Sequence, residues 1–332
     1  MKQTIENLCI SYHLGKLLSD PVSVTGGLMH RMYHVKTTQG EYAVKQLNAN
    51  IMQRPTAFQN MVNAEMVSNA LKETVALAAA KCFDGKCILE YEGFFWIIFD
   101  WTEGKSVYPP DITEAHCALV GRILGCIHAA NLQIETIKRN TEARESFAWH
   151  EWLVHARTES RECYALLQEH MNDILRWDEA FSASWPLVQR HQVISHRDLD
   201  PKNILWKGGQ PVIIDWEAAG YVNPAQELVE VMNYWIVGTD GQYSRSKFDA
   251  LMNAYTACID VSGENWDAVL SASFAGMLGW LAYNTKRAVG LEGSGESDRE
   301  QGLFQIRQTL RELCQYQAQL EQLKQWLLSF CI

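Results

Sequence analysis

Short apolar segments separated by glycine-containing turns dominate the first hundred residues. The segments 33–37 and 42–47 flank the turn at Gln39-Gly40, a pattern typical of a β-hairpin. The segments 78–83, 87–91 and 94–99 are divided by Asp84-Gly85 and Glu92-Gly93. Because glycine in the second position of a tight turn between apolar segments indicates antiparallel pairing, we expect a small antiparallel sheet. One segment, 57–71, instead has apolar residues at helical spacing and predicts a helix.

Helical periodicity takes over after residue 112. Thr113 is a plausible N-cap for a helix reaching about residue 130. Further helices are predicted at about 147–157, 160–177, 182–191, 225–237, 244–259, 265–289 and 298–329, with short strands at 193–195, 204–207 and 211–215. The predicted fold is therefore α+β with two lobes: an N-lobe of residues 1–100, a hinge or linker of residues 101–111, and a helical C-lobe of residues 112–332. Ligands commonly bind in the cleft between two such lobes.

Composition narrows the function classes. Hydrophobic residues make up 47% of the chain and charged residues 20%, as in soluble globular proteins. The net charge of −10 argues against a nucleic-acid partner, and solubility explains it better than attraction of a cationic substrate. The nine cysteines are scattered without zinc-binding spacing, so we expect small buried apolar residues in a reducing cytoplasm. The chain opens without a signal-peptide pattern, and no apolar segment approaches the roughly 20 residues that span a bilayer, so neither secretion nor a membrane partner is expected.

Three polar residues carry the main chemical signal. Asp198 lies in the segment Ser195-His-Arg-Asp-Leu-Asp-Pro-Lys-Asn203, and Asp215 ends the apolar segment 212–214. Phosphoryl transfer needs a group that orients the attacking hydroxyl and oxygen ligands for Mg²⁺. We interpret Asp198 as the catalytic base, and Asn203 with Asp215 as the metal ligands.

Other residues fit binding of ATP or GTP. Gly26 and Gly27, between two predicted strands, would let the backbone approach a phosphate. Lys45, at the end of an apolar strand, would reach the phosphates, and Glu65 in the following helix is the candidate partner of this lysine, with Glu73 as an alternative. The backbone of Asp100, Trp101 and Thr102, after the last strand, could pair with the purine edge, although a plain linker remains the alternative.

These motifs resemble the aminoglycoside phosphotransferase/choline kinase superfamily, which has the protein-kinase-like fold. The resemblance covers about residues 22–290. It includes Gly26-Gly-Leu-Met-His-Arg-Met-Tyr-His-Val35, Leu124-Gly-Cys-Ile-His128, His196-Arg-Asp-Leu-Asp-Pro-Lys-Asn203 and Ile214-Asp-Trp-Glu217. The chain departs from the family pattern at four positions: His30 and Asn223 replace Asn and Asp, Arg197 resembles the protein-kinase loop, and Glu227 replaces Asp while keeping its charge. The resemblance implies an Mg²⁺-dependent transfer of the γ-phosphate of ATP or GTP to a hydroxyl.

The spacing after Asp215 favours a small acceptor over a protein. Only eight residues separate Asp215 from Pro224, where a helix is predicted to begin, which leaves little room for a peptide-docking segment. We expect an aminoglycoside-type antibiotic as acceptor, with choline or another amino alcohol, a sugar or homoserine as alternatives. Candidate acceptor-binding residues are Glu217, Glu230, Trp235, Asp240, Trp280 and Tyr283, although Trp280 and Tyr283 could equally pack in a core.

A nucleotide-binding pseudokinase is the alternative from another class. Loss of Asp198, Asn203, Asp215 or Lys45 would have indicated it, and all four residues are present. The expected protein is a monomer or homodimer.

Overall fold

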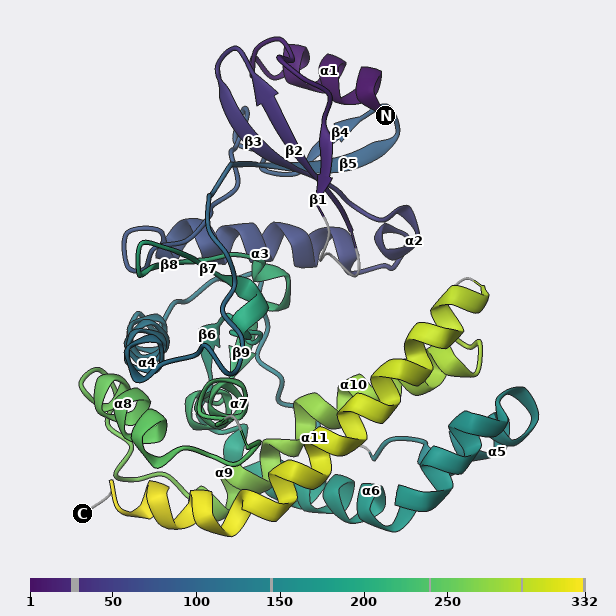
Figure 1. Cartoon of the computed structure of the whole chain (residues 1–332), viewed down its shortest axis with the longest axis vertical. Helices are drawn as coiled ribbons and strands as arrows, with labels where there is room; N and C mark the ends of the chain where they lie inside the picture. The colour runs from purple at the N-terminus through teal and green to yellow at the C-terminus, as the bar shows by residue number, and fades with distance from the viewer. Residues whose placement is uncertain (25–29, 144–145, 239, 294, 331–332) are drawn as a thin grey trace. The chain divides into compact units, whose positions relative to one another are not determined.

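The computed structural model describes residues 1–24, 30–143, 146–238, 240–293 and 295–330 (Figure 1). By its internal contacts the chain forms two units: residues 1–138 with 193–221, and residues 139–192 with 222–332. The predicted N-lobe, hinge and C-lobe were defined by their expected roles, so their boundaries differ from those of these two units. The predicted boundaries stay a prediction. The architecture is α+β, as predicted, with a small antiparallel sheet and a mostly helical remainder.

The first unit contains a five-stranded antiparallel sheet. Its strands are β1 (Val22–Val24), β2 (Arg31–Thr37), β3 (Gly40–Gln46), β4 (Leu89–Tyr91) and β5 (Phe94–Asp100), in the order β1-β2-β3-β5-β4. The β2–β3 and β4–β5 hairpins turn where glycine was expected, and all pairs among these strands are antiparallel. Lys45 on β3 is paired with Ile97 on β5.

Side-chain alternation gives the sheet two buried faces. One face, with Val44, packs against α1 (Lys2–Ser11) through Ile5 and Leu8. The other face, with Ile97, packs against α3 (Ala57–Leu71). Since successive strand residues point to opposite faces, Lys45 points to the α3 side. The helix α1 was not predicted, although its buried residues Ile5, Leu8 and Cys9 have helical spacing. The short α2 (Ala49–Met52) follows β3.

The rest of the first unit carries the polar motif segments. These are α4 (Glu114–Ala129), β6 (Val193–Ser195), η1 (Pro201–Asn203), β7 (Ile204–Lys207), β8 (Gln210–Ile213), η2 (Trp216–Ala218) and β9 (Gly220–Val222). Thr113 caps α4 as predicted, since its side chain accepts from the amide of His116. β7 and β8 form an antiparallel hairpin, and β6 pairs with β9. The Ile213 backbone also pairs with Ala76 and Ala78, which tethers β8 to the segment after α3.

The second unit is helical. It contains α5 (Trp149–Glu159), α6 (Arg161–Val188), α7 (Pro224–Trp235), α8 (Arg245–Thr256), α9 (Trp266–Ala272), α10 (Phe274–Ala288) and α11 (Glu296–Leu328). α10 and α11 lie side by side, and α6 packs against α5, α9 and α10 (Figure 1). The two helices predicted at 160–177 and 182–191 are one helix. Asp178 is buried at its middle, where its carboxylate accepts from Trp149 Nε1 and the amide of Phe147, so the polar residue does not end it.

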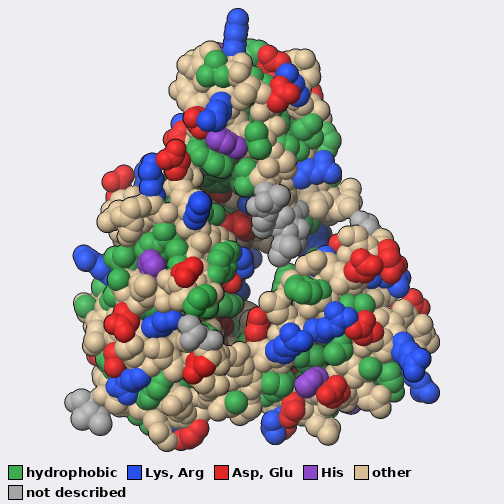
Figure 2. Space-filling view, viewed as in Figure 1, with side chains coloured by type: hydrophobic (Ala, Val, Ile, Leu, Met, Phe, Trp, Pro, Cys, Tyr) green, Lys and Arg blue, Asp and Glu red, His purple; other side chains and the backbone are tan. Residues whose placement is uncertain are grey.

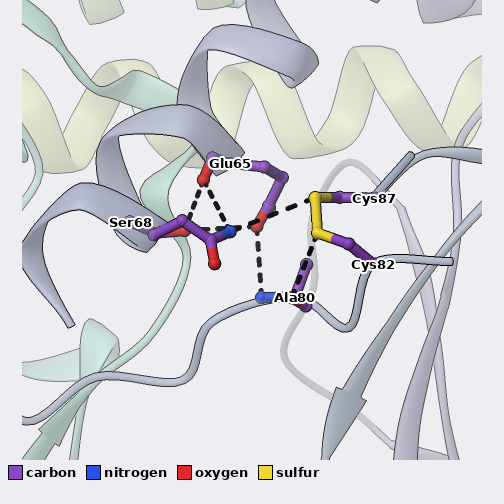
Figure 3. The surroundings of a disulfide bond; sticks show 6 residues. Glu65, Ser68, Ala80, Cys82 and Cys87 are labelled. Carbon is purple, nitrogen blue, oxygen red and sulfur yellow. Dashed lines mark hydrogen bonds between the residues drawn. A yellow bond between two sulfur atoms is a disulfide. The ribbon is translucent and has the colours of Figure 1, made fainter. Parts of the chain in front are cut away.

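The cysteines depart from expectation at one place. Cys82 and Cys87 form a disulfide, although we predicted reduced, buried thiols (Figure 3). The Asp84-Gly85 turn has positive φ at both residues and brings the cysteine Cα atoms to 4.1 Å. Three of the free cysteines, Cys9, Cys117 and Cys163, are buried as predicted.

Charged side chains are mixed over the face drawn in Figure 2. Acidic and basic side chains are interspersed on this face, in small groups of each kind, instead of gathering into one large acidic patch. Among the described residues, no helix combines the length and the apolar character needed to cross a bilayer.

Candidate active site

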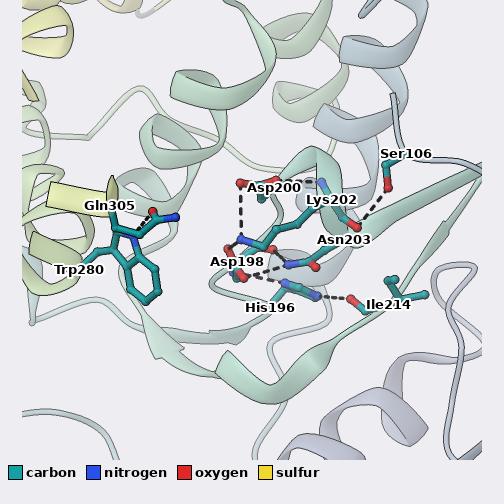
Figure 4. A network of polar contacts seen from close by, with 9 residues as sticks. All are labelled: Ser106, His196, Asp198, Asp200, Lys202, Asn203, Ile214, Trp280 and Gln305. Carbon is teal, nitrogen blue, oxygen red and sulfur yellow. Dashed lines mark hydrogen bonds and ion pairs between the residues drawn. The ribbon is translucent and has the colours of Figure 1, made fainter. Parts of the chain in front are cut away.

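The predicted catalytic loop and metal strand are joined by one buried histidine. His196 Nδ1 accepts from the amide of Asp198 at 3.2 Å, which leaves the proton of the neutral ring on Nε2. His196 Nε2 faces the carbonyl oxygen of Ile214 at 3.1 Å (Figure 4). The amide of Ile214 in turn donates to the carbonyl of Asn203 at 2.9 Å. These bonds fix Asp198, Asn203 and Asp215 in register.

Asn203 orients Asp198 and keeps one oxygen for another task. Its Nδ2 donates to the carbonyl oxygen of Asp198 at 2.8 Å and to Asp198 Oδ2 at 2.9 Å. Because both contacts use the amide nitrogen, the Asn203 Oδ1 remains for a cation, and a neutral amide oxygen is a ligand that Mg²⁺ accepts. Among the described residues, no group of three His, Cys, Asp or Glu side chains has a metal-binding arrangement, so a metal here would rely on Asn203 with Asp215.

Lys202 accompanies the predicted base. Its Nζ lies 3.3 Å from Asp198 Oδ1 and 3.6 Å from Asp200 Oδ2. Burial raises the pKa of Asp198 above its ordinary value, and the charge of Lys202 opposes this shift. Sequence analysis gave Lys202 no role, although its position four residues after Asp198 in η1 brings the two side chains together.

Lys45 is a buried cation between two carboxylates. Its Nζ lies 3.1 Å from Asp215 Oδ1 and also contacts Glu217 Oε1. Burial works to lower the pKa of Lys45, but Asp215 and Glu217 outweigh it and raise the pKa above its ordinary value. Asp215 sits in the left-handed region at φ 61°, an uncommon conformation for a residue other than glycine, and its side chain is 44% exposed. Lys45 and Asp215, 170 residues apart, therefore belong to one site.

Glu65, the predicted partner of Lys45, has other contacts. Its Oε2 accepts from the amide of Ala80 and from the Ser68 hydroxyl, both at 3.3 Å (Figure 3). Burial raises the pKa of Glu65 to about 7, an effect that the nearby charge of Lys45 only partly offsets. Among the described residues, the ion pairs of Lys45 are those with Asp215 and Glu217, so an ion pair with Glu65 is absent from this conformation.

Glu217 lies beside Lys45, and its predicted role in binding the acceptor stays a prediction. Burial alone would raise its pKa, but the adjacent His30 and the charge of Lys45 lower it to about 2. The Oε2 atom of Glu217 lies 3.2 Å from His30 Nε2, while Oε1 contacts Lys45. In the sequence, His30 stood out only as a departure from the family pattern. Its contact with Glu217 joins two segments that lie far apart in the chain, so no local pattern reveals it.

The hinge residues are held partly by their own neighbours. The amide of Trp101 donates to the carbonyl of Glu41 at 2.9 Å, and the Trp101 ring stacks on His34 with centroids 3.7 Å apart. Lys81 contacts the Asp100 carboxylate at 2.9 Å. The Trp101 amide is thus already used, and a purine role for Asp100, Trp101 and Thr102 stays a prediction. Gly26 and Gly27 lie outside the described residues.

The remaining acceptor candidates are in the second unit. Trp235 is fully buried in its core, which speaks against contact with a ligand. Trp280 Nε1 donates to Gln305 on α11 (Figure 4). The Trp280 ring stacks on Tyr283. Glu230 accepts from Gln226, and the exposed Asp240 accepts from the amide of Gln242. Asn223 caps α7 by accepting from the amide of Gln226. Binding of an acceptor by these residues stays a prediction.

Comparison with known sequences identifies related proteins. The model of the phosphotransferase enzyme family matches residues 22–260. A homoserine kinase of Nitrobacter winogradskyi is 25% identical over 247 residues, which are 74% of this chain and 72% of that protein. A homoserine kinase of Paramagnetospirillum magneticum is 22% identical over 80% of both chains.

Solved structures share the fold at low identity. A spectinomycin phosphotransferase in complex with ADP and spectinomycin has a TM-score of 0.72 at 12% identity, covering 96% of this chain and 98% of that one. A choline kinase from Cryptosporidium parvum has a TM-score of 0.54 at 12% identity, covering 99% of this chain and all of the other. At this identity the likeness concerns the fold alone.

Proposed function

We propose a co-substrate and an acceptor for this chain, which belongs to the phosphotransferase enzyme family and is a small-molecule kinase with a hydroxyl acceptor. The proposed reaction transfers the γ-phosphate of ATP to the hydroxyl of a small amino alcohol, with homoserine as the first candidate. The observation that carries this choice is the likeness to homoserine kinases over about three quarters of the chain.

The chain's residues support this chemistry. Asp198 would accept the proton of the attacking hydroxyl, with its Oδ2 oriented by Asn203. Lys45 would contact the phosphates of the nucleotide, as a buried ammonium suits a polyanion. The oxygens of Asn203 and Asp215 fit a hard cation, so we propose that they hold Mg²⁺, which when bound neutralises charge on the nucleotide phosphates.

The antibiotic acceptor favoured by the sequence analysis differs from homoserine in size and charge. Homoserine is a small zwitterion, whereas an aminoglycoside is a polycation that an acidic surface attracts. The mixed charges on the face shown in Figure 2 give no special support to a polycation. Antibiotics therefore belong in the test as competitors and not as the lead.

The test is a coupled ADP-release assay with Mg-ATP. The panel holds L-homoserine, choline, ethanolamine, a monosaccharide, spectinomycin and an aminoglycoside, with the Asp198→Asn variant as the control for each. We expect saturable, Asp198-dependent turnover with homoserine, and a phosphate monoester in the product by ³¹P NMR. Saturation by another acceptor with none by homoserine would refute the acceptor and keep the reaction class. Slow hydrolysis of ATP without any acceptor would also leave the acceptor open, and binding of Mg-ATP without hydrolysis or transfer would support the pseudokinase alternative.

A further inference from the structure

Lys202 places an ammonium beside the predicted base (Figure 4). Its Nζ lies 3.3 Å from Asp198 Oδ1 and 3.6 Å from Asp200 Oδ2, and these two carboxylates are its ion-pair partners among the described residues. An ammonium has three N–H donors, so one remains after both contacts are made. The Lys202 side chain is 48% exposed, which leaves this donor accessible to a ligand.

The backbone of Lys202 is fixed on both sides of its Cα atom. The amide donates to Asp200 Oδ1 at 2.8 Å, the contact that caps η1, and the carbonyl oxygen accepts from the Ser106 hydroxyl at 3.2 Å. Pro201, which begins η1, adds a fixed φ angle just before the lysine. The side chain therefore starts from a defined point in the loop, four residues after the predicted base.

Asp198 is held in place without its ion pair to Lys202. Asn203 donates to the carbonyl oxygen of Asp198 at 2.8 Å and to its Oδ2 at 2.9 Å. The amide of Asp198 donates to His196 Nδ1. Because these three bonds already orient the carboxylate, positioning of the base does not require the lysine, and the ammonium is available to another group.

The transferred phosphoryl group must pass close to this ammonium. A hydroxyl bonded to Asp198 lies about 2.7 Å from the carboxylate, and the phosphorus that it attacks lies about 3 to 3.5 Å from the hydroxyl oxygen. During phosphoryl transfer, negative charge is spread over the three phosphoryl oxygens, and fixed cations beside them lower the barrier. Since Lys202 Nζ lies beside the same carboxylate, its remaining donor can reach these oxygens.

We propose that Lys202 is a catalytic residue that donates to the phosphoryl group while this group passes from ATP to the hydroxyl at Asp198. The bond between the acceptor oxygen and the γ-phosphorus forms as the bond to the β–γ bridging oxygen breaks, and ADP leaves with that electron pair. The hydroxyl proton passes to Asp198, and Lys202 keeps its own protons. Asp200 retains the ammonium at the loop when the contact with Asp198 gives way to the phosphoryl oxygens. The inference rests on the proposed roles of Asp198 and ATP but not on homoserine as the acceptor.

Kinetics and calorimetry together test this role. The acceptor is whichever compound saturates the enzyme, or water in ATP hydrolysis where none does. We expect Lys202→Met, which keeps the length of the side chain without its charge, to lower kcat about 10- to 100-fold. The affinity for Mg-ATP should stay near the wild-type value, because the contact forms as the phosphoryl group leaves ADP. A loop disturbed by loss of an ion pair would instead displace Asn203, the proposed metal ligand, and weaken Mg-ATP binding.

Two matched variants separate the charge of Lys202 from general effects. Lys202→Arg keeps a cationic donor and should lose less kcat than Lys202→Met. Lys207→Met makes the same change at an exposed lysine of β7, paired with Glu103, and should match the wild type. An unchanged kcat in Lys202→Met, equal losses in the two Lys202 variants, or a loss explained by weaker Mg-ATP binding would overturn the proposal.

A double-mutant cycle distinguishes direct action from action through the base. If Lys202 contacts the phosphoryl group, Lys202→Met should lower the residual single-turnover rate of Asp198→Asn further. If Lys202 acts only through Asp198, the second substitution should change nothing, and that result would refute the proposal. Transfer to another acceptor but not to homoserine refutes the proposed acceptor and leaves this test intact. A wild type that transfers phosphate neither to an acceptor nor to water would overturn the role of Lys202.

Discussion

The ionisation of Glu65 can be tested through protein stability. Burial raises the pKa of this carboxyl from 4.5 to about 7 in the folded protein. Between these values the folded state keeps the proton that the unfolded state has released. Since stability changes with pH according to the difference in bound protons, the Glu65 contribution falls as pH rises from about 4.5 to about 7. The Glu65→Gln variant removes this titration, and its amide oxygen can still accept from Ala80.

The structure sets the size of this effect. Raising this pKa from 4.5 to about 7 corresponds to about 3 kcal/mol, because a tenfold change in proton affinity is worth about 1.4 kcal/mol. Glu65 is only 7% exposed, so solvent screening does little to reduce this value. Relative to the variant, the wild type should therefore lose up to about 3 kcal/mol of stability across this window.

The assay is urea unfolding of wild type and variant from pH 4.5 to 8, with the two midpoints subtracted at each pH. Subtraction cancels the titration of all other groups, and Glu90→Gln controls for the loss of a surface charge. A difference that stays constant with pH, or a wild type that gains stability over the variant as pH rises, would show that Glu65 is ionised in the folded protein. An ionised Glu65 would then be available as a further carboxylate partner for Lys45.

Three further predictions concern the site and the hairpin. Asp198→Asn should reduce turnover by about 10²- to 10⁴-fold while Mg-ATP affinity, measured by calorimetry, stays near the wild-type value; retained turnover would remove Asp198 as the base. Asp215→Asn should abolish the difference in ATP affinity between solutions with and without Mg²⁺, and a persisting difference would contradict its role as a ligand. Alkylation without reductant, followed by mass spectrometry, should leave Cys82 and Cys87 unlabelled. Replacing both by serine should cost about 2 kcal/mol in the chain-entropy model for so short a loop, and labelling of both in the native protein would refute the disulfide.

Local signals made much of the fold predictable. The glycine turns predicted the β2–β3 and β4–β5 hairpins, and Thr113 marked the start of α4. The Asp198–Asn203 contact follows from five-residue spacing in a single tight loop, so sequence alone could anticipate it. The helix α1 carried a readable signal in Ile5, Leu8 and Cys9, which the strand-rich surroundings obscured.

What the sequence could not reveal depends on contacts between distant segments. The continuity of α6 depends on Asp178 finding donors 29 and 31 residues away. The disulfide depends on a turn geometry that brings the Cα atoms of Cys82 and Cys87 to 4.1 Å. The two carboxylates that contact Lys45 lie at least 170 residues after it in the chain. Glu65 was the predicted partner because it lies in the helix that follows the strand of Lys45.

The charges around Lys45 explain how two carboxylates, those of Asp215 and Glu217, can contact one lysine side chain. One ammonium cannot neutralise three nearby carboxylates, and burial raises the pKa of Glu65, the one of the three without an ion pair to Lys45, to about 7. Asp215 and Glu217 then leave the site with one surplus negative charge, which favours the arrival of a cation. A cation that engages Asp215 removes this surplus and leaves Glu217 with Lys45, so that the metal and the ammonium can act on the same phosphates without competing for one carboxylate. On this argument the second carboxylate is what allows the first to serve the metal.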